Sequence, residues 1–346
     1  MEGAEPGVVP AVESTADDIT EMRIRGAAAI ADAAAGALET QAERSTADSP
    51  AAFEREIHAA AETLYETRPT AVSLPNALRY VLRGMDGDTV ADLRSSTIAR
   101  AQRFQRDLDQ AQDRLGEIGA NRLRDGDTVM THCHSTDALA CVEAALEAGK
   151  ELAAIVKETR PRKQGHITAR QLREWDVPVT LIADNAARRY LDRADHVLVG
   201  ADSIAADGSV INKIGTSGLA VNARERGVPV MVAAQTIKLH PDTMTGHTVE
   251  IEMRSERELL ADEERAAIVG GEATDGDAKG DATGSDADDP APATDSGLTV
   301  ENPAFDVTPP RYVDAIVTER GQFPPESIVT LMRELFGEPT DDPWED

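Results

Sequence analysis

The sequence predicts an α/β protein in which an N-terminal helical domain, residues 1–125, precedes a Rossmann-like domain with a doubly wound parallel sheet, residues 126–346. Two patterns predict this fold class. Apolar residues recur at helical spacing through the first part of the chain, whereas short β-branched runs alternate with helical segments from Thr128 onward. Runs that are apolar on both faces and separated by helices are typical of a parallel sheet covered on both sides.

The helical domain is predicted from residues 15–125, which carry long amphipathic stretches in AAFEREIHAAAETLYET and again from about Val90 to Leu123. Pro69 and Pro75, in TRPTAVSLPNAL, are expected to break the helices between these stretches, because proline lacks the N–H that an interior helical position needs. This part of the chain should therefore be a set of packed helices.

The sheet is predicted from six apolar runs, of which the first five are each followed by a turn-rich segment and then a helix-like one. The last run is followed by a helix in FPPESIVTLMRELFG. The predicted strands are TVMTH (128–132), LAAIV (152–156), PVTLI (178–182), HVLVG (196–200), VPVMVA (228–233) and VDAIV (313–317).

Acidic residues dominate the charge of the chain, which carries a net charge of -28 and has six lysines against 29 arginines. The stretch from Glu272 to Asp295 accounts for -7 of this total, with eight acidic residues and one lysine, so most of the charge lies elsewhere. Residues 270–297 contain no Val, Leu, Ile, Met or aromatic residue. We expect them to form a disordered insertion with no function of its own, because they cannot bury apolar area.

An acidic, lysine-poor composition is typical of a protein kept soluble in multimolar salt, where a Debye length of ~3 Å screens self-repulsion. A halophile's cytoplasmic protein is therefore expected, with an acidic protein from ordinary salt as the alternative. The charge argues against nucleic-acid binding. No apolar run reaches the ~18 residues of a membrane span, the N-terminus lacks signal-peptide features, and the two cysteines make no disulfide framework.

Polar residues follow each apolar run, at the edge of an open α/β sheet where ligands bind. Four of the six lysines, Lys157, Lys163, Lys213 and Lys238, lie in these loops. Because the chain otherwise avoids lysine, their placement predicts a phosphate-bearing or otherwise anionic ligand.

Cys133, in THCHS, lies between the first predicted strand and the following helix, and could be a metal ligand, a small buried residue or a reactive thiolate. Strand alternation turns His132 and His134 away from the cysteine and no spaced Cys or His partners follow, so a metal site is disfavoured. A buried inert cysteine is the default for a lone Cys. A helix N-terminus lowers the pKa of a thiol, so we predict that Cys133 is a thiolate base or nucleophile.

Asp202, in GADSI, is brought to the same edge by the apolar run VLVG, beside a glycine that allows close approach of the backbone. A carboxyl group in an apolar pocket would have a raised pKa and could act as an acid. The alternative role, a helix cap or turn former, suits Asp207-Gly208 better, because Asp-Gly is a turn signal.

Asn212 and Lys213 precede Gly215-Thr216-Ser217-Gly218, which is expected to open the next helix. The free N–H groups of that helix N-terminus, together with the Lys213 ammonium, would suit a phosphate group.

The motifs THCHS, ETRPRKQGH, GADSIAADGSVINKIGTS and NPAFDVTPP together resemble one family. It joins methylthioribose-1-phosphate isomerases, archaeal ribose-1,5-bisphosphate isomerases and the alpha, beta and delta subunits of translation initiation factor 2B. The resemblance runs from about Ile19 to Gly337 and leaves out the acidic insertion. Several independent motifs in the same order make it specific.

The resemblance implies that Cys133 and Asp202 are the catalytic pair, which the initiation-factor subunits lack. It also favours the archaeal bisphosphate isomerase, because this chain has HSTDAL after the cysteine and AAQTIKLHP, with Lys238, where methylthioribose-1-phosphate isomerases usually have other residues. An extra cation is what a second phosphate would need. The implied substrate-binding residues are Arg25, Gly26, Ala27, Ala28, Arg68, Asn212, Lys213 and Lys238.

The implied reaction is conversion of ribose 1,5-bisphosphate to ribulose 1,5-bisphosphate in AMP degradation, without a metal or an organic cofactor. AMP as an activator and a homo-oligomeric assembly, a dimer or a hexamer, are implied as well. Methylthioribose-1-phosphate isomerase in methionine salvage and a non-catalytic nucleotide or sugar-phosphate sensor are the alternatives. The sequence leaves open whether six further residues touch the substrate: His132, His134, Asp137, Arg160, Arg162 and Lys163.

Overall fold

The computed structural model describes residues 7–24, 26–68, 71–241, 243–249, 251–269 and 297–336. Two compact units are present, one formed by Met1–Glu250 with Phe305–Asp346 and the other by Ile251–Ala304. The acidic stretch that the sequence predicts to be disordered lies outside the described residues, apart from Gly297.

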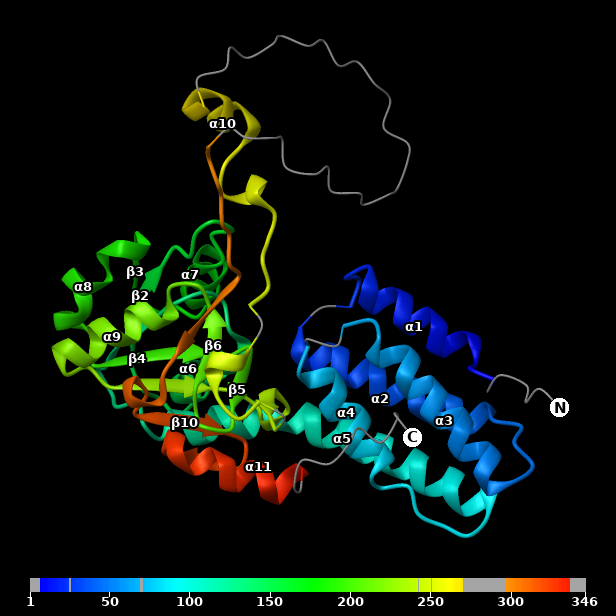
Figure 1. Cartoon of the computed structure of the whole chain (residues 1–346). Coiled ribbons are helices and arrows are strands. Elements are labelled where there is room, and N and C mark those ends of the chain that lie inside the picture. The colour runs from blue at the N-terminus through cyan, green and yellow to red at the C-terminus, as the bar shows by residue number, and fades with distance from the viewer. Residues whose placement is uncertain are drawn as a thin grey trace. The chain divides into compact units, whose positions relative to one another are not determined.

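Five helices form the first part of the larger unit (Figure 1), as the sequence predicts. Their apolar faces share one core, to which Phe53, Leu78 and Ile57 contribute fully buried side chains. Pro75 does not break a helix, contrary to the prediction, because it lies in the first turn of α4, where its missing N–H has no intrahelical partner to lose. The helices are α1 Pro10–Thr20, α2 Ala27–Arg44, α3 Pro50–Tyr65, α4 Ser73–Leu82 and α5 Val90–Ala120.

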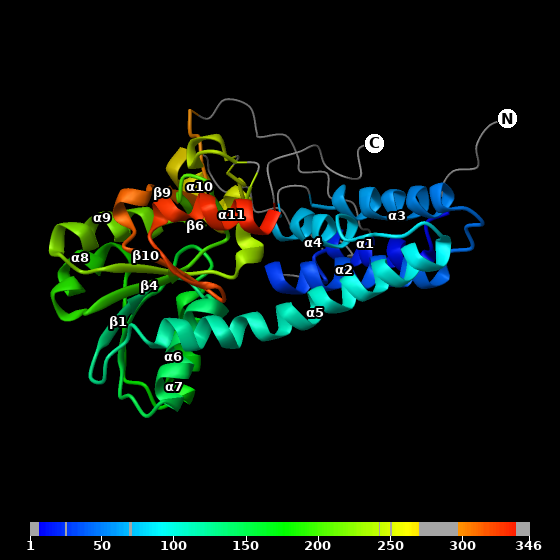
Figure 2. The same cartoon turned by 90° about the horizontal axis from the view of Figure 1, so that it is seen from below.

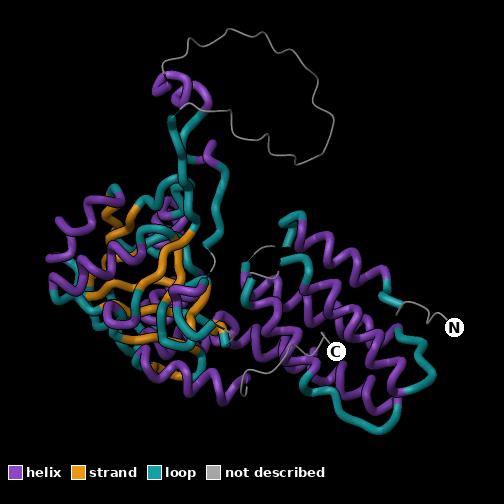
Figure 3. Tube along the Cα trace, in the orientation of Figure 1, coloured by secondary structure: helices purple, strands orange, loops and turns teal. Residues whose placement is uncertain are grey.

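A seven-stranded sheet of order β11-β10-β7-β4-β1-β2-β3 follows. Figure 3 shows the strands gathered in the part of the chain that comes after the five helices. All pairs are parallel except the one between β10 and β11, an edge hairpin that the sequence did not indicate. The strands are β1 Thr128–Thr131, β2 Ala153–Lys157, β3 Val179–Ile182, β4 His196–Gly200, β7 Val230–Ala233, β10 Ala315–Thr318 and β11 Gly321–Phe323.

Alternating side chains of the central strands enter two separate cores, one on each face of the sheet. In β4, Val197 and Val199 point into the core shared with α8, α9 and α11, whereas Leu198 points into the core shared with α5, α6 and α7. The predicted doubly wound arrangement is therefore confirmed. The covering helices are α6 Thr136–Glu147, α7 Gly165–Glu174, α8 Ala187–Tyr190, α9 Thr216–Arg226 and α11 Ile328–Phe336.

A second, four-stranded sheet has the order β8-β5-β6-β9. Its strands β5 and β6 follow β4, where the sequence indicated only a polar loop, whereas β8 follows β7 and β9 precedes β10. The predicted turn at Asp207-Gly208 joins β5 to β6; Gly208 has φ 82°, and Asp207 accepts the Ser209 N–H at 2.9 Å. None of these strands is a continuous apolar run of the kind that marked the predicted strands of the main sheet. They are β5 Ser203–Ala205, β6 Val210–Lys213, β8 Leu239–His240 and β9 Phe305–Thr308.

Helix α5 connects the helical part to the sheet, and Figure 2 shows it running from the other N-terminal helices to α6. Its first half contributes Ala101 to the helical core and its second half contributes Leu115 to a core of the sheet. Gly116 and Gly119 let the two helices touch, because a Cβ at either position would overlap Ala140 or Cys141 of α6. The boundary predicted at residue 125 therefore falls after a helix that serves both parts.

The smaller unit contains helix α10, Asp262–Val269, and an isolated β-bridge between Met253 and Pro303. Its described helix buries no side chain, and Ile268 is 62% exposed. Among all the described helices, none is both long and apolar enough to cross a membrane.

Candidate active site

The two predicted catalytic residues follow the neighbouring strands β1 and β4, between which the order of strands along the chain reverses. β1 leads through α6 to β2 on one side, whereas β4 leads through the second sheet and α9 to β7 on the other. Cys133 comes two residues after β1 and Asp202 two residues after β4, which pairs with β1. Ligands of doubly wound sheets bind at such a switch point, so the topology brings both residues to the expected place.

Gly200, the last residue of β4, lets the backbone segments meet closely, as predicted. A Cβ at this position would overlap the side chain of Ser135. Ser135 is the N-cap of α6, and its Oγ accepts the Ala138 N–H at 3.2 Å. The glycine therefore brings the start of α6 against the end of β4.

The Cys133 thiol is buried, with the residue 8% exposed, and its Sγ donates to Gln164 Oε1 at 3.5 Å. Burial raises the pKa of Cys133 to about 11, the His134 N–H and the charge of Lys213 lower it, and Asp202 and Asp184 raise it. The pKa of Cys133 is therefore not lowered as predicted, because desolvation outweighs the favourable N–H and lysine interactions.

Asp202 is exposed, so it does not lie in the apolar pocket that was predicted for it. Its N–H donates to the Ile211 carbonyl at 2.9 Å, which fixes the backbone against β6. Its charge raises the pKa of both Cys133 and Lys238. The charge of Asp202 therefore acts on both the Cys133 thiol and the Lys238 ammonium.

Lys238 ends a short 3-10 turn, Thr236–Lys238, that follows β7. Its Nζ donates to Asp137 Oδ2 at 2.8 Å, and Asp137 also accepts Gln235 Nε2 at 2.9 Å. Burial alone would lower the pKa of Lys238, but Asp137 and then Asp202 outweigh it and raise that pKa. Asp137, whose role the sequence left open, is thus a buried carboxylate that holds Lys238 at the site.

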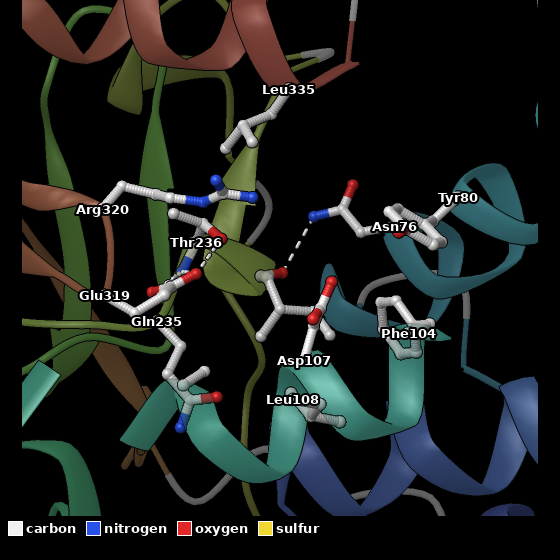
Figure 4. Close-up of a pocket in the computed structure, with 12 residues that line it drawn as sticks. Asn76, Tyr80, Phe104, Asp107, Leu108, Gln235, Thr236, Glu319, Arg320 and Leu335 are labelled. Atoms are coloured by element: carbon white, nitrogen blue, oxygen red, sulfur yellow. Dashed lines mark hydrogen bonds between the residues drawn. The ribbon is translucent and has the colours of Figure 1, made fainter. Parts of the chain in front are cut away.

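Asn76 of α4 holds the same turn from the helical part of the chain. Its Nδ2 donates to the Ile237 carbonyl at 2.8 Å (Figure 4) and to the Leu239 carbonyl at 2.7 Å. Helix α2 also contacts the turn. Sequence reasoning missed Asn76, because nothing local marks an asparagine within an amphipathic helix as a partner of residues about 160 positions away.

A cavity of about 100 Å³ adjoins this turn on the side of α4 and α5 (Figure 4). Tyr80 and Phe104 line one side of it, and Glu319 and Arg320 the other. Glu319 accepts the Thr236 N–H and hydroxyl. The residues that line the cavity include neither Cys133 nor Asp202, so the cavity is separate from the site at the switch point.

Asn212 and Lys213 lie at the end of β6. Asn212 is buried and its Nδ2 donates to Thr216 Oγ1 at 3.0 Å. Lys213 Nζ lies 4.4 Å from the centre of the Phe305 ring, and its charge lowers the pKa of Cys133. Lys213 is therefore a cation of this site, whereas Asn212 also holds the start of α9.

The N-terminus of α9 is occupied by a carboxylate, so the predicted phosphate site there is wrong. Asp306 of β9 accepts the Gly215 N–H at 2.7 Å and the Ser217 N–H at 3.0 Å. Burial raises the pKa of Asp306, although the two N–H groups and the charge of Lys157 oppose the rise. The helix N-terminus is used to bind an acidic residue from a strand that comes about 90 positions later.

Lys157 and His132 hold the turn before α9. Lys157 is 3% exposed and its Nζ donates to the Gly215 carbonyl at 3.0 Å, while His132 Nε2 donates to the Ile214 carbonyl at 2.8 Å. Burial lowers the pKa of Lys157. Burial and the charge of Lys157 lower the pKa of His132 to about 4. Both side chains have internal partners, and binding of an anion by Lys157 stays a prediction.

The remaining predicted residues are less closely tied to the switch point. Arg25 lies outside the described residues; Gly26, with φ 93°, caps α2, and Ala27 and Ala28 begin it. Arg68 follows α3 and its carbonyl accepts the Ala71 N–H. Their role in binding substrate stays a prediction.

Among the residues that the sequence left open, Arg160, Arg162 and Lys163 are exposed after β2. His134 is half-buried, with Nδ1 3.1 Å from Thr168 Oγ1, and burial lowers its pKa. Within the described residues, His, Cys, Asp and Glu form no group of three that could hold a metal ion. A reaction without metal or organic cofactor remains a prediction.

Comparison with known proteins decides the family. The model of the initiation factor 2 subunit family matches residues 23–325. The chain belongs to this family. A family member from Haloterrigena turkmenica, named ribose 1,5-bisphosphate isomerase, is 75% identical over 100% of both chains. Another of that name, from Haloferax volcanii, is 65% identical over 97% of this chain and 96% of its own.

Solved structures of the family agree with the fold. A translation initiation factor eIF-2B of Pyrococcus horikoshii is 28% identical, with a TM-score of 0.69, over 93% of this chain and 99% of its own. The 5-methylthioribose 1-phosphate isomerase of the same organism is 32% identical, with a TM-score of 0.67, over 94% and 87%. Family members named for different functions thus share this fold, so the function of this chain has to be inferred from its site.

Proposed function

We propose that this protein is an isomerase that converts ribose 1,5-bisphosphate to ribulose 1,5-bisphosphate. The observation that carries the proposal is the placement of Cys133 and Asp202 directly after the neighbouring strands β1 and β4, at the switch point of the sheet. The full-length relatives that are 75% and 65% identical carry the name of this activity, which agrees with the function predicted from the sequence.

The two lysines support a substrate with two phosphate groups. Lys213 lies after β6 and acts on the Cys133 thiol, whereas Lys238 lies after β7 and acts with Asp202. Lys238 is paired with Asp137, so a phosphate would have to share it with that carboxylate. Arg25 and Arg68 are further proposed cations.

The proposed mechanism requires Cys133 to lose its proton before reaction. A pKa of about 11 favours the protonated thiol at neutral pH, and Asp202 is exposed. Catalysis needs a Cys133 thiolate and a neutral Asp202. A sugar that covers Asp202 would remove it from water and favour its protonated form. Substrate binding would thereby transfer the proton from the cysteine to the aspartate.

The reaction then proceeds with both groups returned to their starting state. Asp202 gives its proton to the ring oxygen as the bond from that oxygen to C1 breaks. The Cys133 thiolate removes the C2 proton to form an enol phosphate, then returns a proton to C1. The C2 hydroxyl proton passes to Asp202 as the C2 ketone forms. Each well-placed acid–base group contributes about 10²–10⁴-fold in rate.

The proposal is tested by offering the purified protein ribose 1,5-bisphosphate and methylthioribose 1-phosphate separately in high KCl. Formation of ribulose 1,5-bisphosphate alone is the expected result. Turnover of the methylthio sugar alone would assign the protein to the other isomerase activity. No turnover of either sugar, with binding of a nucleotide, would instead favour a sensor.

The catalytic pair is tested by Cys133→Ser and Asp202→Asn, each expected to fold and to lose at least about 10²-fold in kcat. Cys141→Ser and Asp207→Asn are the matched controls, because Cys141 is buried in α6 and Asp207 lies in the β5–β6 turn. A rate close to that of the wild type in either test variant would remove that residue from the mechanism.

Three further properties belong to the proposal as predictions. AMP is expected to activate the enzyme, the chain is expected to form a dimer or a hexamer, and the cytoplasm is its expected location. Initial rates with and without AMP and the mass of the particle in solution test the first two.

A further inference from the structure

The backbone of Cys133 has a conformation that is unusual for a residue with a side chain. Its φ is 70°, in the left-handed region that favours glycine. β1 ends at Thr131, so the peptide groups of Cys133 lie beyond the ladder of the sheet. Such a conformation persists only where the surrounding structure holds it in place.

Two buried hydroxyl groups bind both peptide groups of Cys133. The Cys133 N–H donates to Thr159 Oγ1 at 2.8 Å, and Thr168 Oγ1 donates to the Cys133 carbonyl at 2.8 Å. Thr159 and Thr168 are each 1% exposed. They come from different elements, the loop after β2 and helix α7, so neither bond is formed by local sequence.

The two threonines are themselves fixed by neighbours. The Thr159 N–H donates to Asp184 Oδ1 at 2.9 Å, and its hydroxyl lies 3.1 Å from the Lys157 carbonyl and 3.2 Å from His132 Nδ1, either of which can accept its proton. A hydroxyl has one proton, so Thr168, which donates to Cys133, can only accept from His134 Nδ1 at 3.1 Å. Both hydroxyl groups are therefore held by neighbours on other sides and leave Cys133 little freedom to turn.

We propose that Thr159 and Thr168 are positioning residues that hold Cys133 in its left-handed conformation and thereby fix the position of its sulfur. The proposal rests on the proposed function only in treating Cys133 as the base. It differs from a merely structural role for the threonines, because it links two hydroxyl groups to the electrostatic environment of a sulfur atom.

The test compares Thr159→Val and Thr168→Val, which keep the shape and remove the hydroxyl, with Thr159→Ser and Thr168→Ser, which keep it. We expect kcat to fall about 10–100-fold in the valine variants with KM changed less than about threefold, since small displacements of a reacting group cost up to about 10²-fold. The serine variants should stay within about threefold of the wild type. Thr97→Val is the matched control, because Thr97 is fully buried and bonds only within α5.

A second readout does not need isomerase activity. The rate of Cys133 alkylation by iodoacetamide should rise when Asp202→Asn is introduced into the wild-type chain. In chains that carry Thr159→Val or Thr168→Val, Asp202→Asn should increase the alkylation rate by less than half as much. The reason is that the Cys133 sulfur is no longer held at its position in the wild-type chain. If the wild type turns over no sugar phosphate, this coupling still decides the proposal.

An undiminished response of alkylation to Asp202→Asn in both valine variants would overturn the proposal, as would an equal loss of kcat in Thr97→Val. Should a valine variant unfold, Cys133→Gly is added to it, because glycine adopts the left-handed conformation without support. Partial recovery of folding in that double variant is expected. Absence of recovery, or equal recovery of an unfolded Thr97→Val chain, would count against the proposal.

Discussion

At the scale of single residues, the chemistry of Cys133 is decided first by burial and then by the opposing charges of Lys213 and Asp202. Burial makes the thiol a weak acid with a pKa of about 11, Lys213 counteracts this and Asp202 reinforces it. Because only the thiolate reacts with alkylating agents, the reaction rate of the free protein should increase about tenfold per pH unit from neutral pH towards that pKa.

We therefore predict opposite effects for two substitutions at one site. Asp202→Asn removes a negative charge, lowers the pKa of Cys133 and increases the alkylation rate at pH 8 by a few-fold. Lys213→Gln removes a positive charge, raises that pKa and decreases the rate. Mass spectrometry of the alkylated Cys133 peptide over a pH series measures both. Changes in the same direction would show that the two charges do not act on the sulfur as the structure places them.

At the scale of elements, the start of α9 is stabilised by a residue from another strand rather than by its own sequence. Asp306 of β9 accepts two of the first N–H groups of α9 and thereby joins the second sheet to the helix that follows β6. The same turn is held from the main sheet by His132 and Lys157. Lys213 leads directly into this turn, so the cap also fixes a residue of the proposed site.

Asp306→Ala should lower the free energy of unfolding by about 1–3 kcal/mol, because it leaves buried N–H groups of α9 without an acceptor. Urea unfolding followed by circular dichroism measures the change. Glu225→Ala, on the exposed side of the same helix, is the control and should change stability by no more than about 0.5 kcal/mol. Equal effects of the two substitutions would exclude a capping role for Asp306.

At the scale of the whole molecule, a net charge of -28 makes stability depend on salt. Repulsion among acidic groups destabilises the folded chain at low ionic strength and is screened when the Debye length falls from ~10 Å at 0.1 M to ~3 Å at 1 M. The halophilic origin predicted from composition agrees with the two relatives from Haloterrigena and Haloferax.

The melting temperature should therefore rise between 0.1 M and 3 M KCl, by about 10 °C if screening contributes several kcal/mol. Differential scanning calorimetry gives the value, and sucrose of equal osmolality controls for effects unrelated to charge. A melting temperature that sucrose raises as much as KCl would mean that repulsion among acidic groups is not the main cause of instability at low salt.

How far the sequence could predict this protein follows from the range of the interactions involved. Local apolar patterns predict the main strands and the helical first part. Chain order then fixes the topology of the α/β sheet, which places Cys133 and Asp202 at one edge. The four short strands of the second sheet gave no such pattern, apart from the turn at Asp207-Gly208. The family, too, was identifiable from motifs and is confirmed.

Only the tertiary structure decided which of these polar groups are accessible and in what state. Lys157 and the N–H groups at the start of α9 were predicted to bind a phosphate. In the structure, Lys157 donates to the Gly215 carbonyl, and Asp306 accepts the N–H groups. The thiol of Cys133 looked activated by a helix, yet burial leaves it protonated. Desolvation and long-range hydrogen bonds depend on what the folded chain brings together, whereas the sequence by itself determines only where along the chain each group stands.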